Sequence, residues 1–224
     1  MKKILLVSTA SVLLFAMFYC KKDGVYETST TDSLSPAIHN IVPDSILTKM
    51  KKLGFTVNEG FTPPNLENTY FVSPFVLDSS NVPNDYRGAV FADYTVKFYD
   101  QDNSKLTIKL NSSGGGETDL GLGGFLAGKN NLFTVFLKVK SEIGGDSCTG
   151  VFVISGKVEA GGIRNFKYAN FMLNNYGNPH GYFIKNGQGR IIYDQDSISP
   201  VLVEHTSIKL EKALKVGFSS PFLK

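Results

Sequence analysis

The stretch ADYTVKFYDQDNSKLTIKLN, residues 92–111, decides the fold because apolar and polar residues alternate in both of its halves. The alternating apolar residues are Tyr94, Val96 and Phe98 in the first half and Leu106, Ile108 and Leu110 in the second. A period of two places these side chains on one face of a strand and the polar ones on the other. The polar segment 100–104 between the halves favours a turn. The stretch therefore predicts an antiparallel hairpin with one buried face.

The same alternation recurs along most of the chain, which predicts about eight strands. The further candidates are TYFVSPFVL (69–77), FTVFLKV (133–139), GVFVISGKV (150–158), FKYANFML (166–173), GYFIK (181–185) and GRIIYD (189–194). The connections after Tyr86 are short, and Asn186-Gly187 suits a tight turn. We therefore expect an all-β domain over residues 41–224, a single antiparallel β-barrel of lipocalin-like type or, as the alternative, a sandwich.

Three other segments do not follow this alternation. Residues 43–54 predict a short N-terminal helix that begins at Pro43 and Asp44, ends at Gly54 and buries Ile46, Leu47, Met50 and Leu53. The glycine-rich segment SSGGGETDLGLGG (112–124) lacks the spacing of a phosphate-binding loop and is expected to form a mobile loop at the barrel mouth. The segment SIKLEKALKVG (207–217) favours a helix or an irregular cover over a strand.

The N-terminus has the pattern of an exported protein. Lys2 and Lys3 precede an uncharged apolar run over residues 4–19, which predicts a signal peptide over residues 1–19. Cys20 follows it, and its thiol has three possible fates: a lipid anchor, a disulfide with Cys148, or the end of a membrane-inserted segment. The Ser/Thr-rich sequence that comes next predicts a flexible tether over residues 20–40.

Several motifs resemble those of exported lipoproteins of Bacteroidota. They are CKKD (20–23), GFTPPNLENTYFVSP (60–74), RGAVFADYTVKFYDQ (87–101) and NGQGRIIYD (186–194). The resemblance implies that Cys20 is lipidated, that the membrane is a partner through this anchor, and that the protein resides in the cell envelope, at the outer membrane. It implies no particular activity.

The charge distribution argues against nucleic acid as a partner. The formal net charge is +3, but Lys2, Lys3, Lys21 and Lys22 all precede Asp23, and from Asp23 onward 19 basic residues face 20 acidic ones. A domain without a basic excess lacks the electrostatic footprint that nucleic acid requires. The three histidines are scattered without metal-ligand spacing, so we expect neither a metal site nor a cofactor.

The segment from Gly161 to Arg190 is the best candidate for a binding surface, because it combines aromatic rings with amides and arginines. Such groups bind small ligands, glycans or protein segments, and the candidate residues are Arg164, Tyr168, Asn170 and Arg190. The competing interpretation is that the aromatics form core and the asparagines form turns. We expect a non-enzymatic binding protein with no catalytic residues. The alternative is an exported carbohydrate-active hydrolase that uses carboxylates inside the barrel.

Overall fold

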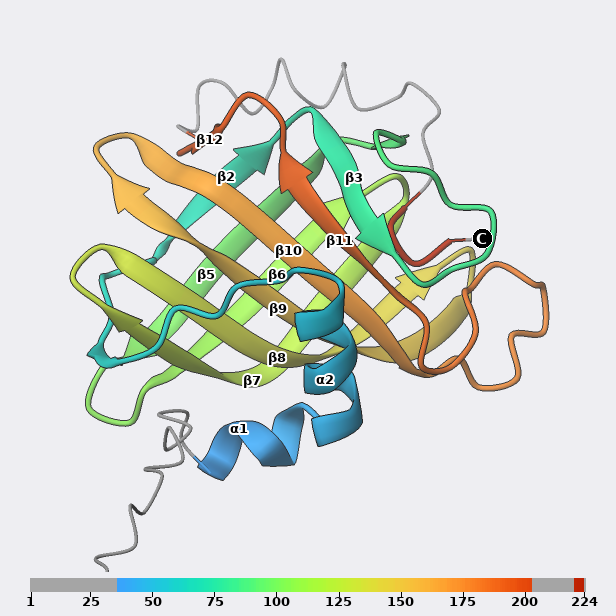
Figure 1. Cartoon of the computed structure of the whole chain (residues 1–224), viewed down its shortest axis with the longest axis horizontal. Coiled ribbons are helices and arrows are strands. Elements are labelled where there is room, and N and C mark those ends of the chain that lie inside the picture. Colours follow the sequence, from blue (N-terminus) through green and yellow to red (C-terminus); the bar gives the residue numbers. More distant parts are fainter. Residues whose placement is uncertain (1–35, 203–219, 224) are drawn as a thin grey trace, which may run out of the picture. The chain divides into compact units, whose positions relative to one another are not determined.

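The computed structural model describes residues 36–202 and 220–223, which form two short helices and one sheet of twelve strands (Figure 1). The helices are α1 (Pro36–Ile41) and α2 (Asp44–Lys52). The first strands are β1 (Phe61–Thr62), β2 (Asn68–Val72), β3 (Phe75–Ser80), β4 (Val90–Phe91), β5 (Tyr94–Asp102) and β6 (Thr107–Gly114). The others are β7 (Glu117–Lys129), β8 (Leu132–Ile143), β9 (Asp146–Glu159), β10 (Gly162–Asn174), β11 (Gly189–Asp194) and β12 (Ile198–Pro200). The predicted signal peptide, Cys20, residues 21–35 and the segment 207–217 lie outside the described residues.

The strands from β5 to β10 form an antiparallel meander in chain order. Its first strand, β5, pairs with β2, and its last, β10, pairs with β12. Directly after β12, Val201 forms a bridge with Tyr70 of β2. This bridge closes the ring, so the predicted all-β antiparallel barrel with a short N-terminal helix is confirmed. The two-residue strand β1 pairs with β7 in parallel orientation.

One edge of β10 is shared between two partners. Its first residues pair with β12, and the residues from Lys167 to Phe171 pair with β11, from which the sheet continues to β3 and β4. The segment 69–77, predicted as one strand, is therefore split between β2 and β3, which lie in different parts of the sheet. Pro74 at the division has no backbone N–H to pair across a ladder.

Three local predictions are wrong. Residues 112–124 form no mobile loop, because they end β6, turn at Gly115-Gly116 and begin β7. GYFIK is not a strand but part of the connection from β10 to β11, where Phe183 alone bridges to Leu223. Residues 36–40, predicted as the end of the tether, belong to α1, and Ile38 in this helix is buried.

Two apolar clusters stabilise the fold. The larger one fills the barrel with the inward side chains of the strands, and the smaller one lies between the helices and the outer face of the sheet, where Met50 of α2 packs with residues such as Phe136 and Phe171. The predicted helix is confirmed in α2, since Ile46, Leu47 and Met50 are buried. Figure 1 shows both helices on the outside of the barrel, beneath β7 to β10.

Candidate functional site

Aromatic rings occupy the middle of the barrel. The ring centroids of Phe75 and Tyr94 lie 5.3 Å apart, and those of Phe152 and Tyr168 lie 4.9 Å apart. All four side chains are at most 1% exposed. Such contacts give the interior the density of an ordinary protein core, so a ligand cannot enter the middle of the barrel without displacing side chains.

Near one end of the barrel, the interior contains two carboxyl groups from β7. Glu117 and Asp119 are two residues apart, so both point inward, and they are 1% and 5% exposed. The hydroxyls of Tyr94, Ser112 and Ser141 all donate hydrogen bonds to Asp119. Neither oxygen of Glu117 has a hydrogen-bond partner among the described residues.

These two carboxyl groups titrate differently from exposed ones. Burial raises the pKa of Glu117 well above its ordinary value, and the neighbouring charge of Asp119 raises it further. Burial also raises the pKa of Asp119, while the hydroxyls of Ser141, Tyr94 and Ser112 act in the opposite direction. Glu117 is therefore the member of the pair that holds its proton more strongly.

The arrangement does not resemble the active site of a glycoside hydrolase. Hydrolases of this kind hold two carboxyl groups about 5–9.5 Å apart on either side of the sugar. Glu117 and Asp119 instead lie side by side on one strand, surrounded by side chains such as Tyr168 and Phe222. The pair lacks the open space between carboxylates that the hydrolase alternative requires.

The four predicted ligand-binding residues do not form one surface. Tyr168 and Asn170 are buried, so the interpretation of this part of the segment as core was the better one. Asn170 pairs with Arg190 across the ladder and accepts a hydrogen bond from its backbone N–H (3.2 Å). Arg164 lies near the start of β10, where its Nε donates to Glu159 (2.6 Å) on the outside. The prediction of a shared binding surface is therefore wrong for this set.

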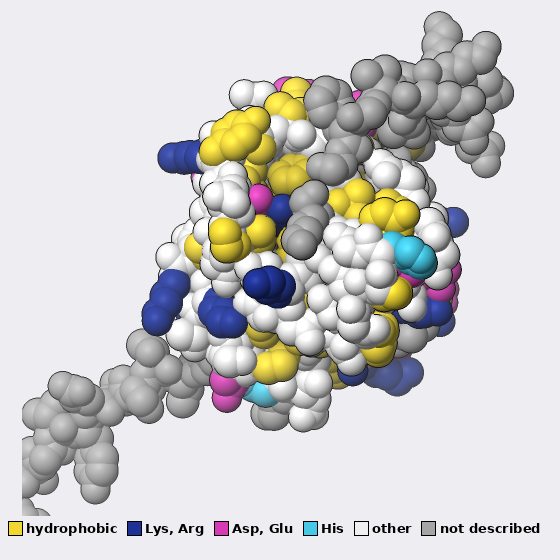
Figure 2. Space-filling model, turned by 90° about the vertical axis from the view of Figure 1, so that its right-hand side faces the viewer, with side chains coloured by type: hydrophobic (Ala, Val, Ile, Leu, Met, Phe, Trp, Pro, Cys, Tyr) yellow, Lys and Arg dark blue, Asp and Glu magenta, His cyan; other side chains and the backbone are white. Residues whose placement is uncertain are grey.

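The side chain of Arg190 is engaged in hydrogen bonds that stabilise the fold. Its Nε and Nη2 donate to the two carboxylate oxygens of Asp85 (2.7 and 3.0 Å). Its Nη1 donates to the backbone carbonyls of Pro221 (2.5 Å) and Leu223 (2.7 Å). The guanidinium thereby holds the segment 220–223 against the barrel end and has little capacity left for a ligand. Figure 2 faces this end of the barrel, where hydrophobic and basic side chains lie close together.

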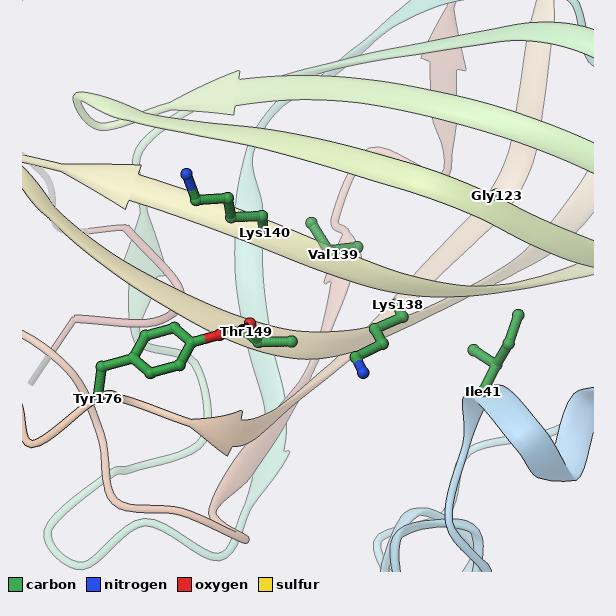
Figure 3. Close-up of a pocket in the computed structure, with 7 residues that line it drawn as sticks. All are labelled: Ile41, Gly123, Lys138, Val139, Lys140, Thr149 and Tyr176. Carbon is green, nitrogen blue, oxygen red and sulfur yellow. Dashed lines mark hydrogen bonds between the residues drawn. The ribbon is translucent and has the colours of Figure 1, made fainter.

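The outer surface contains a groove of about 410 Å³ between the end of α1 and the connection that follows β10 (Figure 3). Its lining residues are Ile41, Gly123, Lys138, Val139, Lys140, Thr149 and Tyr176. In Figure 3 the ring of Tyr176 points toward Thr149 on β9, and the two hydroxyl oxygens are 2.6 Å apart. We call this hollow the outer groove; its size is within the usual range of ligand pockets.

The strand register places the polar groups of the outer groove together. Lys140 of β8 lies opposite Thr149 of β9, and Lys138 lies two residues away on the same face. The Nζ of Lys140 is 2.5 Å from Glu142, whereas no ion pair involves Lys138 in the part of the chain that the structure describes. Among the described residues, the outer groove therefore holds one cation, Lys138, that no carboxylate neutralises.

A second outer hollow, of about 460 Å³, is lined by Arg190, Asp85 and Lys185 among others. It is a weaker candidate, because Arg190 and Asp85 neutralise each other. Sequence reasoning did not select Lys138, Lys140 or Thr149. The outward lysines of β8 were visible in the alternation, but their position beside Ile41 and Tyr176 depends on the folded chain.

In the described ranges, no helix has the length and apolar character that a membrane span needs. No protein-family model matches the chain, and the searches of curated proteins and of solved structures likewise give no significant match.

Proposed function

We propose that this protein is a lipid-anchored protein of the cell envelope, at the outer membrane, and that its barrel binds a ligand or a protein partner without catalysis. The filled interior is the observation that carries the binding part of the proposal. Fully buried rings such as Phe152 and Tyr168 leave the outside of the barrel as the place for recognition.

The order of features at the N-terminus supports the proposed anchor. A basic start, an apolar run, Cys20 and a polar sequence are arranged as in exported lipoproteins. Acylation of Cys20 would use one of the two cysteines, and the other, Cys148, is a free and fully buried thiol. Burial raises the pKa of Cys148, which keeps it protonated and unreactive.

The anchor is tested by growing a bacterial host that expresses the full chain with labelled palmitate. We expect label on the wild-type protein and none on Cys20→Ser, because the thiol of Cys20 accepts the lipid. Globomycin, which blocks the lipoprotein signal peptidase, should cause a larger precursor to accumulate.

Cys148→Ala is the matched control, because it removes the other cysteine and should leave labelling unchanged. If the wild-type protein carries no label and globomycin does not change its processing, the proposed anchor is contradicted. Label that depends on Cys148 would contradict it as well.

A further inference from the structure

The outer groove combines a free positive charge with apolar surroundings. Lys138 contributes an ammonium group without an ion-pair partner among the described residues, and none of the residues that line the groove is acidic. Lys140 adds little net charge, because Glu142 lies 2.5 Å from its Nζ. A lone cation in a partly apolar groove favours a ligand with one negative group.

Beside this cation, Thr149 and Tyr176 supply a hydrogen-bond donor for a ligand. Their hydroxyl oxygens are 2.6 Å apart, and only one of the two hydroxyl protons can lie between them. The other O–H group is free to donate to a ligand. Thr149 is two residues from the position opposite Lys138, within the diagonal reach of a long side chain. One anionic head group can therefore contact Lys138 and this hydroxyl pair together.

The remaining surface of the outer groove is suited to an apolar group. Ile41 forms the edge on the side of α1, and the two lysine side chains, which project from β8 in Figure 3, add apolar methylene groups. Gly123 has no side chain, and a Cβ atom built there would meet nothing within 4 Å, so the groove is open at this point.

We infer that the outer groove binds an amphipathic anion, a molecule with one carboxylate or phosphate head and an apolar chain. Lys138 and the Thr149–Tyr176 pair hold the head, and Ile41 contacts the chain. The inference rests on the proposed function in one respect, namely that the barrel binds ligands on its outer surface. It adds the chemical class of the ligand and the residues that select it.

The test uses decanoate and decyl phosphate as probes, with decyltrimethylammonium as a cation of the same chain length, all titrated calorimetrically into the full chain. We expect both anions to bind and the cation to bind at least tenfold more weakly. Tighter binding of decanoate would identify a fatty acid as the natural class, and tighter binding of decyl phosphate a phospholipid. Both results support the inference.

Variants show whether the binding occurs in the outer groove. Lys138→Glu should weaken the binding of both anions at least tenfold. The double variant Thr149→Val with Tyr176→Phe should weaken their binding about threefold to tenfold. Lys97→Glu is the matched control, because Lys97 is exposed on β5 and lies outside the groove. The chain has no tryptophan, so Ile41→Trp places a single indole at the groove edge, and its emission should shift when decanoate binds.

Three results would overturn the inference: no binding of either anion, equal binding of the cation, or equal losses in Lys138→Glu and Lys97→Glu. None of these results affects palmitate labelling of Cys20. Conversely, loss of labelling with intact decanoate binding would reject the anchor alone, so the two proposals fail separately.

Discussion

Glu117 has an unfavourable environment for a carboxyl group. Its carboxyl group is 1% exposed and has no hydrogen-bond partner in the described part of the chain, whereas Asp119 beside it receives three hydroxyl donors. Leaving a buried polar group unpaired costs about 1–3 kcal/mol. Because this cost falls on a single residue, substitutions of Glu117 should have a measurable effect on stability.

The stability of the protein should fall as the pH rises above about 4.5, partly because of Glu117. The unfolded chain ionises this group near its ordinary pKa of 4.5, but the folded chain holds its pKa well above that value. The unfolded state therefore releases a proton that the folded state retains. Glu117→Gln removes this difference, so the variant should gain stability relative to wild type as the pH rises from 4 to 8, as measured by urea denaturation.

Glu142→Gln provides the comparison, because it makes the same substitution at an exposed position. The dependence of stability on pH that remains in Glu117→Gln comes from other buried carboxyl groups. Among them is Asp194, whose pKa burial raises to about 7. Parallel pH profiles for wild type and Glu117→Gln would show that Glu117 ionises normally in the folded protein.

At the scale of elements, β7 shows why a glycine-rich sequence can be a strand. Gly121 and Gly124 lie next to the side chain of Leu137, and a Cβ atom at either position would come within 2.7 Å of it. The pairing of β7 with β8 shifts register between these two glycines, which marks a bulge. The glycines thus provide room for a core leucine and for a bend in the strand, rather than mobility.

Gly124→Ala should destabilise the barrel by about 1–3 kcal/mol, as expected for overpacking. The new methyl group would lie 2.7 Å from the backbone carbonyl oxygen of Phe136, which a side-chain rotation cannot relieve. Thermal and urea denaturation measure the loss. Thr118→Ala, on the exposed face of the same strand, should stay within about 0.5 kcal/mol; an equal loss in both variants would contradict this account of β7.

The sequence predicts strands well where apolar and polar side chains alternate. It predicts them poorly where close packing against the backbone determines the structure. The alternation identified β5, β6, β8, β9 and β10, and the helical spacing identified α2. It could not show that Gly121 and Gly124 accommodate Leu137, because that contact joins two strands. The candidate site was missed for a similar reason: α1, β8, β9 and the segment after β10 meet only in the folded chain.

For the molecule as a whole, the short C-terminal segment 220–223 completes one end of the barrel. Phe222 is fully buried, and its ring centroid lies 5.3 Å from that of Phe152. The backbone on either side of it accepts hydrogen bonds from Arg190, and the backbone N–H of Ile184 donates to the carbonyl of Phe222. The segment is thus part of the core although it comes from the end of the chain.

Phe222→Ala should therefore cost about 3–5 kcal/mol of the free energy of unfolding. The cavity would open beside Glu117, so water could enter and the pH dependence of stability should become weaker as well. Phe61→Ala is the matched control, since Phe61 is 62% exposed and should change little. A small effect of Phe222→Ala in urea denaturation would mean that the end of the barrel is stable without this segment.

The bridge between Tyr70 and Val201 has a consequence for the order in which the barrel folds. The first and last strands of the ring must meet before the barrel closes, so this pairing joins residues far apart in the sequence and forms late. A chain that emerges N-terminus first cannot complete this seam until almost all of the barrel has been synthesised. Late closure of the seam would suit the export that we propose, because a translocation channel accepts an extended polypeptide.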